Sequence, residues 1–266
     1  MSEEWAPKGV DPTVPNPARV YDYLLGGKDN FKADRDVAEG VLRVLPETRQ
    51  ATRMYRRMVG RFVEYLVGQG VRQFLDLGSG LPTHQNVHEV APPDARVVYV
   101  DNDPVVCTHG RALLAEPDRV VMVEADARDV DGILIEARKH LDLEQPVAVL
   151  MLFLLHFVPD EQDPYAMVAA YRDALVPGSY LVISHTAGDT DPERMGRLVD
   201  NYRQTGTPFR PRSAAEIMPF FGDFELIPPG LANGVTHEWP FGDEQDTMFW
   251  DEKWSKLSYS GIARKP

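Results

Sequence analysis

The 266-residue sequence has a single cysteine, Cys107, and no long apolar run. One cysteine excludes an intrachain disulfide, and no cysteine and histidine spacing typical of a metal site is present. We interpret Cys107 as a packed helix residue and not as a nucleophile. The first residues are acidic and lack the apolar centre of a secretory signal. No run reaches the roughly 20 residues of a membrane span. We therefore expect a cytoplasmic protein with no membrane partner and no metal ion.

Basic residues are scarce relative to acidic ones. The chain has 28 lysines and arginines against 41 aspartates and glutamates, which gives a formal charge of −13. Affinity for nucleic-acid phosphates comes mainly from clustered basic side chains, so general nucleic-acid binding is disfavoured. The composition is 43% hydrophobic and 26% charged, as in ordinary globular domains. The length is sufficient for a full hydrophobic core.

Short apolar segments alternate with helical patterns through most of the chain. Strands are predicted at 72–77, 96–101, 119–124, 146–152 and 179–185, with helices near 84–91, 104–115, 129–140 and 162–175. Further helices are predicted near 191–204 and 213–220, and further strands at 224–227 and 259–264. Apolar strands that alternate with helices indicate an α/β fold with a mostly parallel sheet covered on both faces.

The residues before the first strand have a different pattern. Residues 1–16 hold three prolines and predict an extended arm. Residues 17–31 predict a short helix that stops at Gly26 and Gly27, and two further helices are expected at 34–45 and 47–69. We interpret residues 1–46 as an N-terminal arm and helical cap, and 47–266 as one cofactor-binding domain. The cap is expected to lie over the carboxyl edge of the sheet, where ligands of such folds bind.

The first predicted strand runs into a glycine turn, and the second ends in an acid. Asp76, Gly78 and Gly80 form the turn, which reads D-L-G-S-G-L-P-T from residue 76 to 83. Glycines allow the backbone to lie against a ligand. Asp101, followed by Asn102, ends the second strand, where a carboxylate can accept two hydrogen bonds from a ribose diol. The pattern predicts a nucleoside-cofactor site.

The spacing of the glycines separates two cofactor classes. A dinucleotide fingerprint has a third glycine that admits a pyrophosphate at the helix start. This chain has Thr83 there, preceded by Pro82, which has no N–H to donate to a phosphate. S-adenosyl-L-methionine has no phosphate, so the turn favours that cofactor. An NAD-dependent reductase is further disfavoured because no Tyr-x-x-x-Lys pair is present. A strand–helix turn without a ligand is the remaining alternative.

Further candidates follow the later strands. Asp126 and Ala127 come just after the third strand, where a carboxylate can accept from the adenine amino group; a helix N-cap is the alternative for Asp126. Asp103, before a proline at a helix start, is interpreted as a cap. His156 follows the fourth strand, where a neutral imidazole can accept a proton from an attacking hydroxyl or amine. A hydrogen-bonded core histidine is an equal alternative. His185 is a weaker candidate.

One short N-terminal segment is unusually rich in polar and aromatic residues. Many such side chains lie on both sides of the Gly26–Gly27 pair, within residues 19–34. Aromatic rings can stack on a ligand, and two glycines can act as a hinge. We therefore expect residues 17–31 to act as a lid, with Tyr21 or Asp22 orienting the acceptor. A plain helix followed by a capped turn is the alternative.

With these motifs, the sequence closely resembles a family of S-adenosylmethionine-dependent methyltransferases abundant in actinomycetes, long classified as a domain of unknown function. The matching segments are P-A-R-V-Y-D-Y-L-L-G-G-K-D-N-F-x-x-D at 17–34, D-L-G-S-G-L-P-T at 76–83, V-V-Y-V-D-N-D-P at 97–104 and the closing Y-S-G-I-A-R-K-P. The resemblance implies a class I methyltransferase sheet, Rossmann-like, with its last strand antiparallel between strands 5 and 6, and an N-terminal helical cap. It implies no substrate. Leu81 and Pro82 depart from the wider superfamily, where a third glycine is common.

Methyl transfer from a sulfonium is an in-line displacement that requires mainly proximity and alignment. No covalent intermediate is needed, which agrees with the lack of a nucleophile–base arrangement in the sequence. The enclosed cap favours a small-molecule acceptor, methylated on oxygen or nitrogen. The alternative from another class is a sensor or regulatory protein that binds S-adenosylmethionine without turnover. The sequence contains no signal for an oligomeric state.

Overall fold

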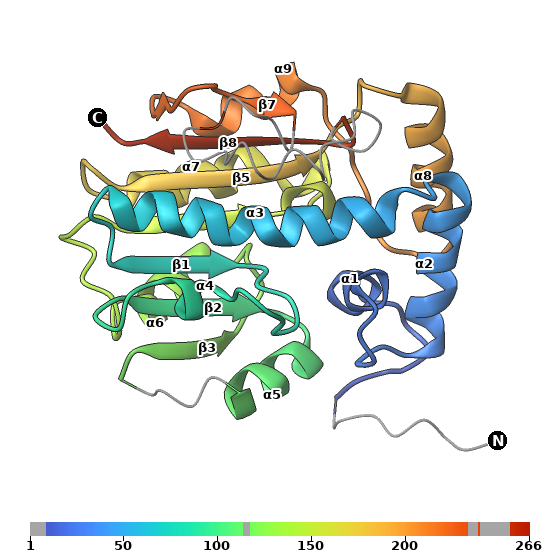
Figure 1. Ribbon diagram of the computed structural model, residues 1–266, viewed down its shortest axis with the longest axis horizontal. Helices are drawn as coiled ribbons and strands as arrows, with labels where there is room; N and C mark the ends of the chain where they lie inside the picture. Colours follow the sequence, from blue (N-terminus) through green and yellow to red (C-terminus); the bar gives the residue numbers. More distant parts are fainter. Residues whose placement is uncertain (1–8, 114–117, 234–238, 240–255) are drawn as a thin grey trace.

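One twisted sheet with helices on both faces forms the body of the protein (Figure 1). The structure is a computed structural model that describes residues 9–113, 118–233, 239 and 256–266. Residues 1–8 of the predicted arm and 114–115 of the predicted helix lie outside the described residues. No helix in these ranges is long and apolar enough to cross a membrane.

The sheet follows the order β3-β2-β1-β4-β5-β8-β6, with β7 also paired to β8. Its strands are β1 (Gln73–Leu77), β2 (Arg96–Asp101), β3 (Val120–Glu124), β4 (Ala148–Leu152), β5 (Tyr180–Thr186), β6 (Glu225–Leu226), β7 (Ala232–Asn233) and β8 (Ser258–Arg264). The first five are parallel, and β8 is antiparallel to both β5 and β6. The expected α/β class and the antiparallel strand between strands 5 and 6 are therefore confirmed.

The helices also follow the predicted order. They are α1 (Pro17–Leu25), α2 (Lys32–Val44), α3 (Thr48–Gly68), α4 (Val87–Val90), α5 (Pro104–Leu113), α6 (Val130–Ala137), α7 (Pro164–Asp173), α8 (Pro192–Gln204) and α9 (Ala214–Ile217). Short 3₁₀ turns occupy Leu155–Phe157, Asp160–Gln162 and Met218–Phe221. The helix predicted at 84–91 is shorter than expected. Gln85 has a left-handed φ of 61° and Asn86 caps the first turn, so α4 cannot begin before Val87.

Alternate residues along the strands enter two separate apolar layers. In β1, Phe74 packs with α3 residues such as Phe62 and Leu66 on one face. The next residue, Leu75, packs with residues of α6 and α7 on the other face. This alternation explains why every residue of β1 is buried. A sheet covered on both faces exposes its ligand-binding loops only at its edges.

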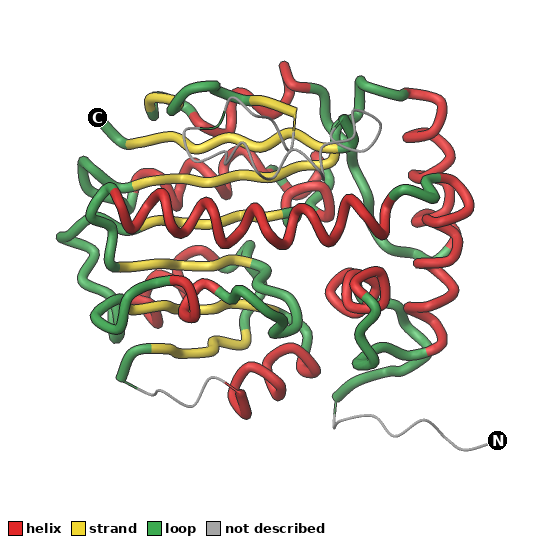
Figure 2. The backbone as a smooth tube through the Cα atoms, viewed as in Figure 1, coloured by secondary structure: helices red, strands yellow, loops and turns green. Residues whose placement is uncertain are grey.

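The first helices lie beyond the carboxyl ends of the parallel strands (Figure 1). Helix α1 is capped at its start by Asn16, whose side chain accepts from Ala18 N–H, and at its end by Gly26, which has a left-handed φ of 92°. It packs on α2 and α3, and α2 packs on α8. Figure 2 shows that the loops after β1, β2 and β4 leave the same edge of the sheet, facing these helices. The division between 1–46 and 47–266 falls in the turn between α2 and α3 and stays a prediction.

Candidate functional site

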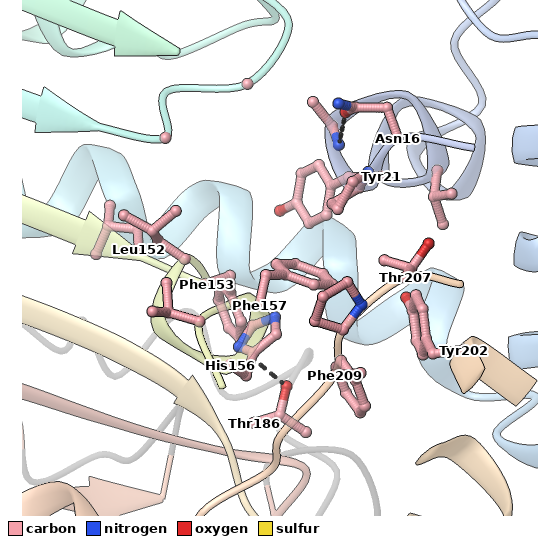
Figure 3. Close-up of a pocket in the computed structure, with 18 of the residues that line it drawn as sticks. Asn16, Tyr21, Leu152, Phe153, His156, Phe157, Thr186, Tyr202, Thr207 and Phe209 are labelled. Atoms are coloured by element: carbon pink, nitrogen blue, oxygen red, sulfur yellow. Dashed lines mark hydrogen bonds between the residues drawn. The ribbon is translucent and has the colours of Figure 1, made fainter. Parts of the chain in front are cut away.

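A cavity of about 510 Å³ lies between the carboxyl edge of the sheet and the helices α1, α2, α3 and α8. This volume is in the range of sites for small ligands. One end is formed by the glycine turn and the loops after β2 and β3. The other end is lined by aromatic and aliphatic side chains, several of which Figure 3 shows around His156. The two ends belong to one continuous space.

The glycine turn has a backbone that only glycine adopts without strain. Gly78 and Gly80 have φ values of 70° and 67°. A Cβ on Gly78 would lie 2.9 Å from Leu154 Cδ1, so that position also lacks room for a side chain. The N–H groups of Gly78 and Ser79 both donate to Val100 O, which holds the turn against β2. The turn therefore presents bare backbone to the cavity.

Two buried carboxyl groups line the cavity beside this turn. Asp101 Oδ2 accepts from Gly80 N at 2.9 Å, and its Oδ1 accepts from Asp103 N at 2.9 Å. A carboxylate oxygen has two lone pairs, so Asp101 keeps acceptor capacity for ligand hydroxyls. Burial raises the pKa of Asp101 to about 6 and that of Asp76 to about 7. Arg56 opposes this rise at Asp76. The carboxyls fit a ligand that donates hydrogen bonds or carries positive charge.

The loop after β3 places Asp126 and Ala127 on the cavity wall, and Asn102 lines it from the loop after β2. Arg128 donates to Asp126 through its backbone N–H at 2.9 Å and through Nε at 2.8 Å. The hydrogen bond from the Arg128 side chain holds the pKa of Asp126 below its usual value. The helix cap considered for Asp126 is instead Asp129, which accepts from Gly132 N. The adenine contact of Asp126 stays a prediction.

Asp103 forms the cap expected of it and an ion pair that was not expected. Its Oδ1 accepts from Val105 N at 2.7 Å at the start of α5. Its Oδ2 lies 3.1 Å from Arg19 Nε in α1. Asp34 Oδ2 approaches the same Nε at 3.7 Å, and all three side chains are buried. The helical cap is therefore attached electrostatically to the loop that carries Asp101.

His156 lies in the 3₁₀ turn after β4, on the cavity wall and only 4% exposed. Its Nδ1 is 3.5 Å from Thr186 Oγ1, the limit of a hydrogen bond. Phe157 and Phe209 surround the ring at centroid distances of 4.4 and 5.3 Å (Figure 3). Burial holds the pKa of His156 well below its usual value. The imidazole is therefore neutral at pH 7, as a proton acceptor must be.

A fully buried arginine fixes the loop that carries His156. Arg212 donates to Leu155 O at 2.8 Å and to Val158 O at 3.0 Å. A guanidinium nitrogen of Arg212 also lies 3.2 Å from Nε2 of His185. The other ring nitrogen of His185, Nδ1, lies 2.9 Å from Thr186 O. His185 is not a cavity residue, and burial lowers its pKa to about 3. Sequence reasoning missed Arg212, because an arginine that follows a proline in a polar loop looks solvent-exposed.

The two lid candidates occupy different positions. Tyr21 lines the cavity, and its hydroxyl donates to Thr52 O in α3 at 3.3 Å. Burial raises the pKa of Tyr21 to about 12, so the hydroxyl stays a donor. Asp22 does not line the cavity. Its Oδ2 accepts from Asp29 N at 3.0 Å and from Asn30 Nδ2 at 2.8 Å, which holds the turn after α1.

A model of the S-adenosyl methyltransferase family matches residues 3–266, which is nearly the whole chain. The chain belongs to the S-adenosyl methyltransferase family. Its cofactor is S-adenosylmethionine, as the glycine turn predicted. The similarity to actinomycete proteins inferred from residues 17–34 is also confirmed by two solved structures.

These structures match over almost their entire length. A DUF574 family protein from Streptomyces avermitilis is 38% identical, with a TM-score of 0.89 over 96% of this chain and 99% of that one. A protein from Thermobifida fusca, described as a candidate methyltransferase, is 42% identical, with a TM-score of 0.88 over 98% and 99%. Among curated proteins, a carboxy-S-adenosyl-L-methionine synthase from Geobacter is 29% identical over 45% of this chain. That alignment spans 46% of the Geobacter protein, about half its length.

Proposed function

We propose that this family member transfers a methyl group to oxygen or nitrogen of a small molecule held in the cavity. The observation that carries the proposal is the single space of about 510 Å³, which joins the glycine turn and Asp101 to His156. Helices α1, α2 and α8 lie over this space (Figure 1). A cavity of this size suits a small acceptor more than a polymer.

The residues at the glycine end fit the cofactor. Asp101 has acceptor capacity for a ribose diol, and the backbone at Gly78 and Gly80 allows close approach. Asp76 and Asn102 would complete the contacts to the methionyl and ribose parts, and the loop with Asp126 and Ala127 those to adenine. S-adenosylmethionine supplies a methyl group on a positively charged sulfur that leaves as a neutral thioether.

The chain's own residues then have mainly to position the acceptor. A neutral His156 accepts the proton that an attacking hydroxyl or amine loses. The Tyr21 hydroxyl, which donates its proton to Thr52 O, presents an oxygen that can accept from the bound molecule, and Asp22 acts as a positioning residue by holding the turn that follows. Excluding water and aligning the acceptor supply most of the rate enhancement in such a displacement.

The named product of the carboxy-S-adenosyl-L-methionine synthases carries a carboxylate, which simple methyl transfer does not require. A buried carboxylate requires a nearby cation. Among the described cavity residues only Arg56 and Arg128 are basic. Arg56 donates to Asn86 Oδ1 at 2.6 Å, and Arg128 binds Asp126. With Arg128 paired to Asp126, Arg56 is the described cavity cation left to face such a carboxylate, whereas methyl transfer to a neutral acceptor needs no such partner.

Two measurements test the proposal. Calorimetry on the full chain should show binding of S-adenosylmethionine and S-adenosylhomocysteine in the micromolar range and none of NAD. Incubation with S-adenosylmethionine and a cell metabolite extract should form S-adenosylhomocysteine, and mass spectrometry should find a product heavier by one methylene. Binding of NAD without S-adenosylmethionine would overturn the proposal. Tight cofactor binding with no turnover in any extract would favour a binding protein instead.

A further inference from the structure

The end of the cavity away from the glycine turn is lined almost without charge. We call this end the acceptor chamber; it is formed by Tyr21, Leu24, Val41, Leu45, Thr52, Tyr55, Phe153, His156, Phe157, Thr186, Met195, Leu198, Tyr202 and Phe209. None of these residues carries a charged side chain at neutral pH. The five charged residues among the described cavity lining are Arg56, Asp76, Asp101, Asp126 and Arg128. The four on β1 and the loops after β2 and β3 lie at the glycine end, whereas Arg56 lies on α3 next to Tyr55, donates to His84 O and acts electrostatically on Tyr21 at the border of the chamber.

The chamber walls are flat aromatic surfaces. Tyr202 of α8 stacks on Phe209 with ring centroids 4.4 Å apart and planes 19° apart. Tyr55 of α3 contacts Phe153 after β4 at 4.7 Å. Figure 3 shows Phe153, Phe157 and Phe209 around the His156 ring. Aromatic pairs give walls that favour planar apolar ligands through stacked and edge contacts.

The lack of charge selects the protonation state of the acceptor. An alkyl amine has a pKa near 10 and enters as a cation, whereas a phenol with a similar pKa is neutral at pH 7. An unpaired ion in such surroundings costs several kcal/mol. No described side chain of the chamber offers a counter-ion for an ammonium, and Arg56, the cation at its border, is directed to His84 O and Asn86 Oδ1. A neutral ring hydroxyl avoids that cost.

A neutral hydroxyl must lose its proton as it attacks, and the chamber holds one group suited to accept it. If His156 Nδ1–H donates to Thr186 Oγ1, at the observed 3.5 Å, the lone pair lies on Nε2. Among the described residues, Nε2 has no hydrogen-bond partner. Its lone pair is therefore available to the acceptor. Arg212 holds the backbone on both sides of His156 and thereby fixes the ring's position.

We propose that the methyl acceptor is an uncharged, planar aromatic compound whose ring hydroxyl is methylated in the acceptor chamber. This inference rests on the proposed function. The acceptor oxygen forms the new bond to the methyl carbon while the carbon–sulfur bond breaks and its electron pair stays on sulfur. The phenolic proton passes to His156 Nε2 and then to solvent. The products are an aryl methyl ether, a neutral thioether and one proton, and no further reactant is needed.

Three matched probes test the charge preference on the full chain saturated with S-adenosylhomocysteine. They are 2-naphthol, naphthalene with a carboxylate in place of the hydroxyl, and naphthalene with an aminomethyl group in place of the hydroxyl. Calorimetry should show 2-naphthol binding at least about tenfold more tightly than either charged probe, which corresponds to ~1.4 kcal/mol. With S-adenosylmethionine, mass spectrometry should detect the methyl ether of 2-naphthol and no methylated amine.

A charge placed in the chamber wall provides the matched control. Leu198→Glu should weaken 2-naphthol and strengthen the aminomethyl probe, while Leu198→Gln should leave the order of the probes unchanged. Ile135→Glu adds the same charge at an exposed position on α6 outside the cavity and should change nothing. Retained S-adenosylhomocysteine binding shows that a variant is folded. If Leu198→Glu does not fold, the three probes on the unaltered protein decide the question.

The outcomes separate the two proposals. Equal or tighter binding of a charged probe, or no binding of 2-naphthol to the saturated protein, overturns the inference and leaves methyltransferase function in place. Methylation of the aminomethyl nitrogen also overturns it. Failure to bind S-adenosylmethionine and S-adenosylhomocysteine overturns the proposed function, and the inference with it.

Discussion

Arg19 Nε in α1 lies 3.1 Å from Asp103 Oδ2, two residues beyond Asp101 at the end of β2. Asp103 N in turn donates to Asp101 Oδ1 at 2.9 Å. A contact chain therefore runs from the helical cap to the carboxylate assigned to the cofactor ribose. Asp34, in the first turn of α2, also faces Arg19 and accepts from Asn16 N at 2.8 Å. The starts of α1 and α2 are therefore both connected to Arg19. The position of α1 and the position of the Asp101 carboxylate are thereby linked.

The two acids after β2 should respond differently to truncation. Asp101→Ala should weaken S-adenosylhomocysteine binding by about 1.5–3 kcal/mol, the usual loss for a hydrogen bond to a charged group. Asp103→Ala should mainly lower stability, on the order of 3 kcal/mol, because it leaves the Arg19 guanidinium buried with a weaker partner. Calorimetry and denaturant unfolding on both variants separate these effects. The reverse pattern, with binding lost only in Asp103→Ala, would show that the two roles are exchanged.

Cofactor binding should weaken in mild acid. The raised pKa values of Asp76, about 7, and Asp101, about 6, mean that both carboxyls take up protons as pH falls through this range. The cofactor's donors and positive charge favour the ionised forms, so affinity is greatest above the higher pKa and falls below it. Titrations between about pH 8 and pH 5 in buffers of different ionisation enthalpy should also show proton release on binding. A pH-independent affinity would contradict this assignment.

Replacement of His156 should affect turnover and leave cofactor binding intact. His156→Asn should lower kcat by about 100-fold or more, the usual contribution of a general base. The lowered pKa of His156 keeps the base form present as pH falls through about 6.5. With saturating cofactor, kcat of the unaltered protein should therefore stay level across that value and fall only at lower pH. An inflection near about 6.5 would mean an ordinary, solvated histidine.

The turn after α1 should depend on the space beside Gly27. A Cβ there would lie 1.9 Å from Asp22 Oδ1, so Gly27→Ala must displace the carboxylate that binds Asp29 and Asn30. We expect a loss of about 1–3 kcal/mol in unfolding free energy, as for overpacking. Gly68→Ala at the exposed end of α3, where a Cβ meets nothing, is the matched control and should be neutral or stabilising. Equal effects in both variants would contradict a positioning role for Asp22.

The N-terminal segment should become protected when ligand binds. Residues 16–24 contribute several side chains to the cavity wall, and Arg19 connects them to the loop after β2. Hydrogen exchange with added S-adenosylhomocysteine should slow at residues 17–31 as well as at the glycine turn, 76–83. Helix α6, on the opposite face, serves as an internal control. Protection at 76–83 alone would identify the segment as static packing and not a lid.

The sheet and its order could be predicted from sequence because they depend on local patterns. The predicted strand at 96–101 matches β2 at both ends, and the other parallel strands differ by at most two residues at each end. The glycine turn was found for the same reason, since positive φ at Gly78 and Gly80 requires a residue type visible in the sequence. The two-residue strand β7 was missed because Ala232 and Asn233 show no apolar pattern, whereas the equally short β6 lies within the apolar segment 224–227.

Contacts between distant charged residues could not be predicted in this way. Arg212 is fully buried and bonds to carbonyls of residues 155 and 158, yet nothing in its neighbours indicates burial. The Arg19–Asp103 pair joins segments on opposite sides of α2 and α3 in the sequence. Asp22 was expected at the acceptor because of its neighbours, but its direction from α1 is set by the turn it binds. Such partners depend on how helices pack, which local pattern does not specify.

The late position of β8 in the chain affects how the protein is made. Ser260 of β8 pairs with Ser184 of β5, yet it is 76 residues further along. At ribosomal rates of about 5–20 residues per second, β5 waits roughly 4–15 seconds for its neighbour. During that interval the side of β5 later covered by β8 presents unpaired backbone groups, which are ready templates for pairing with another chain. Yield during synthesis therefore depends on keeping nascent chains apart until residues 258–264 have emerged.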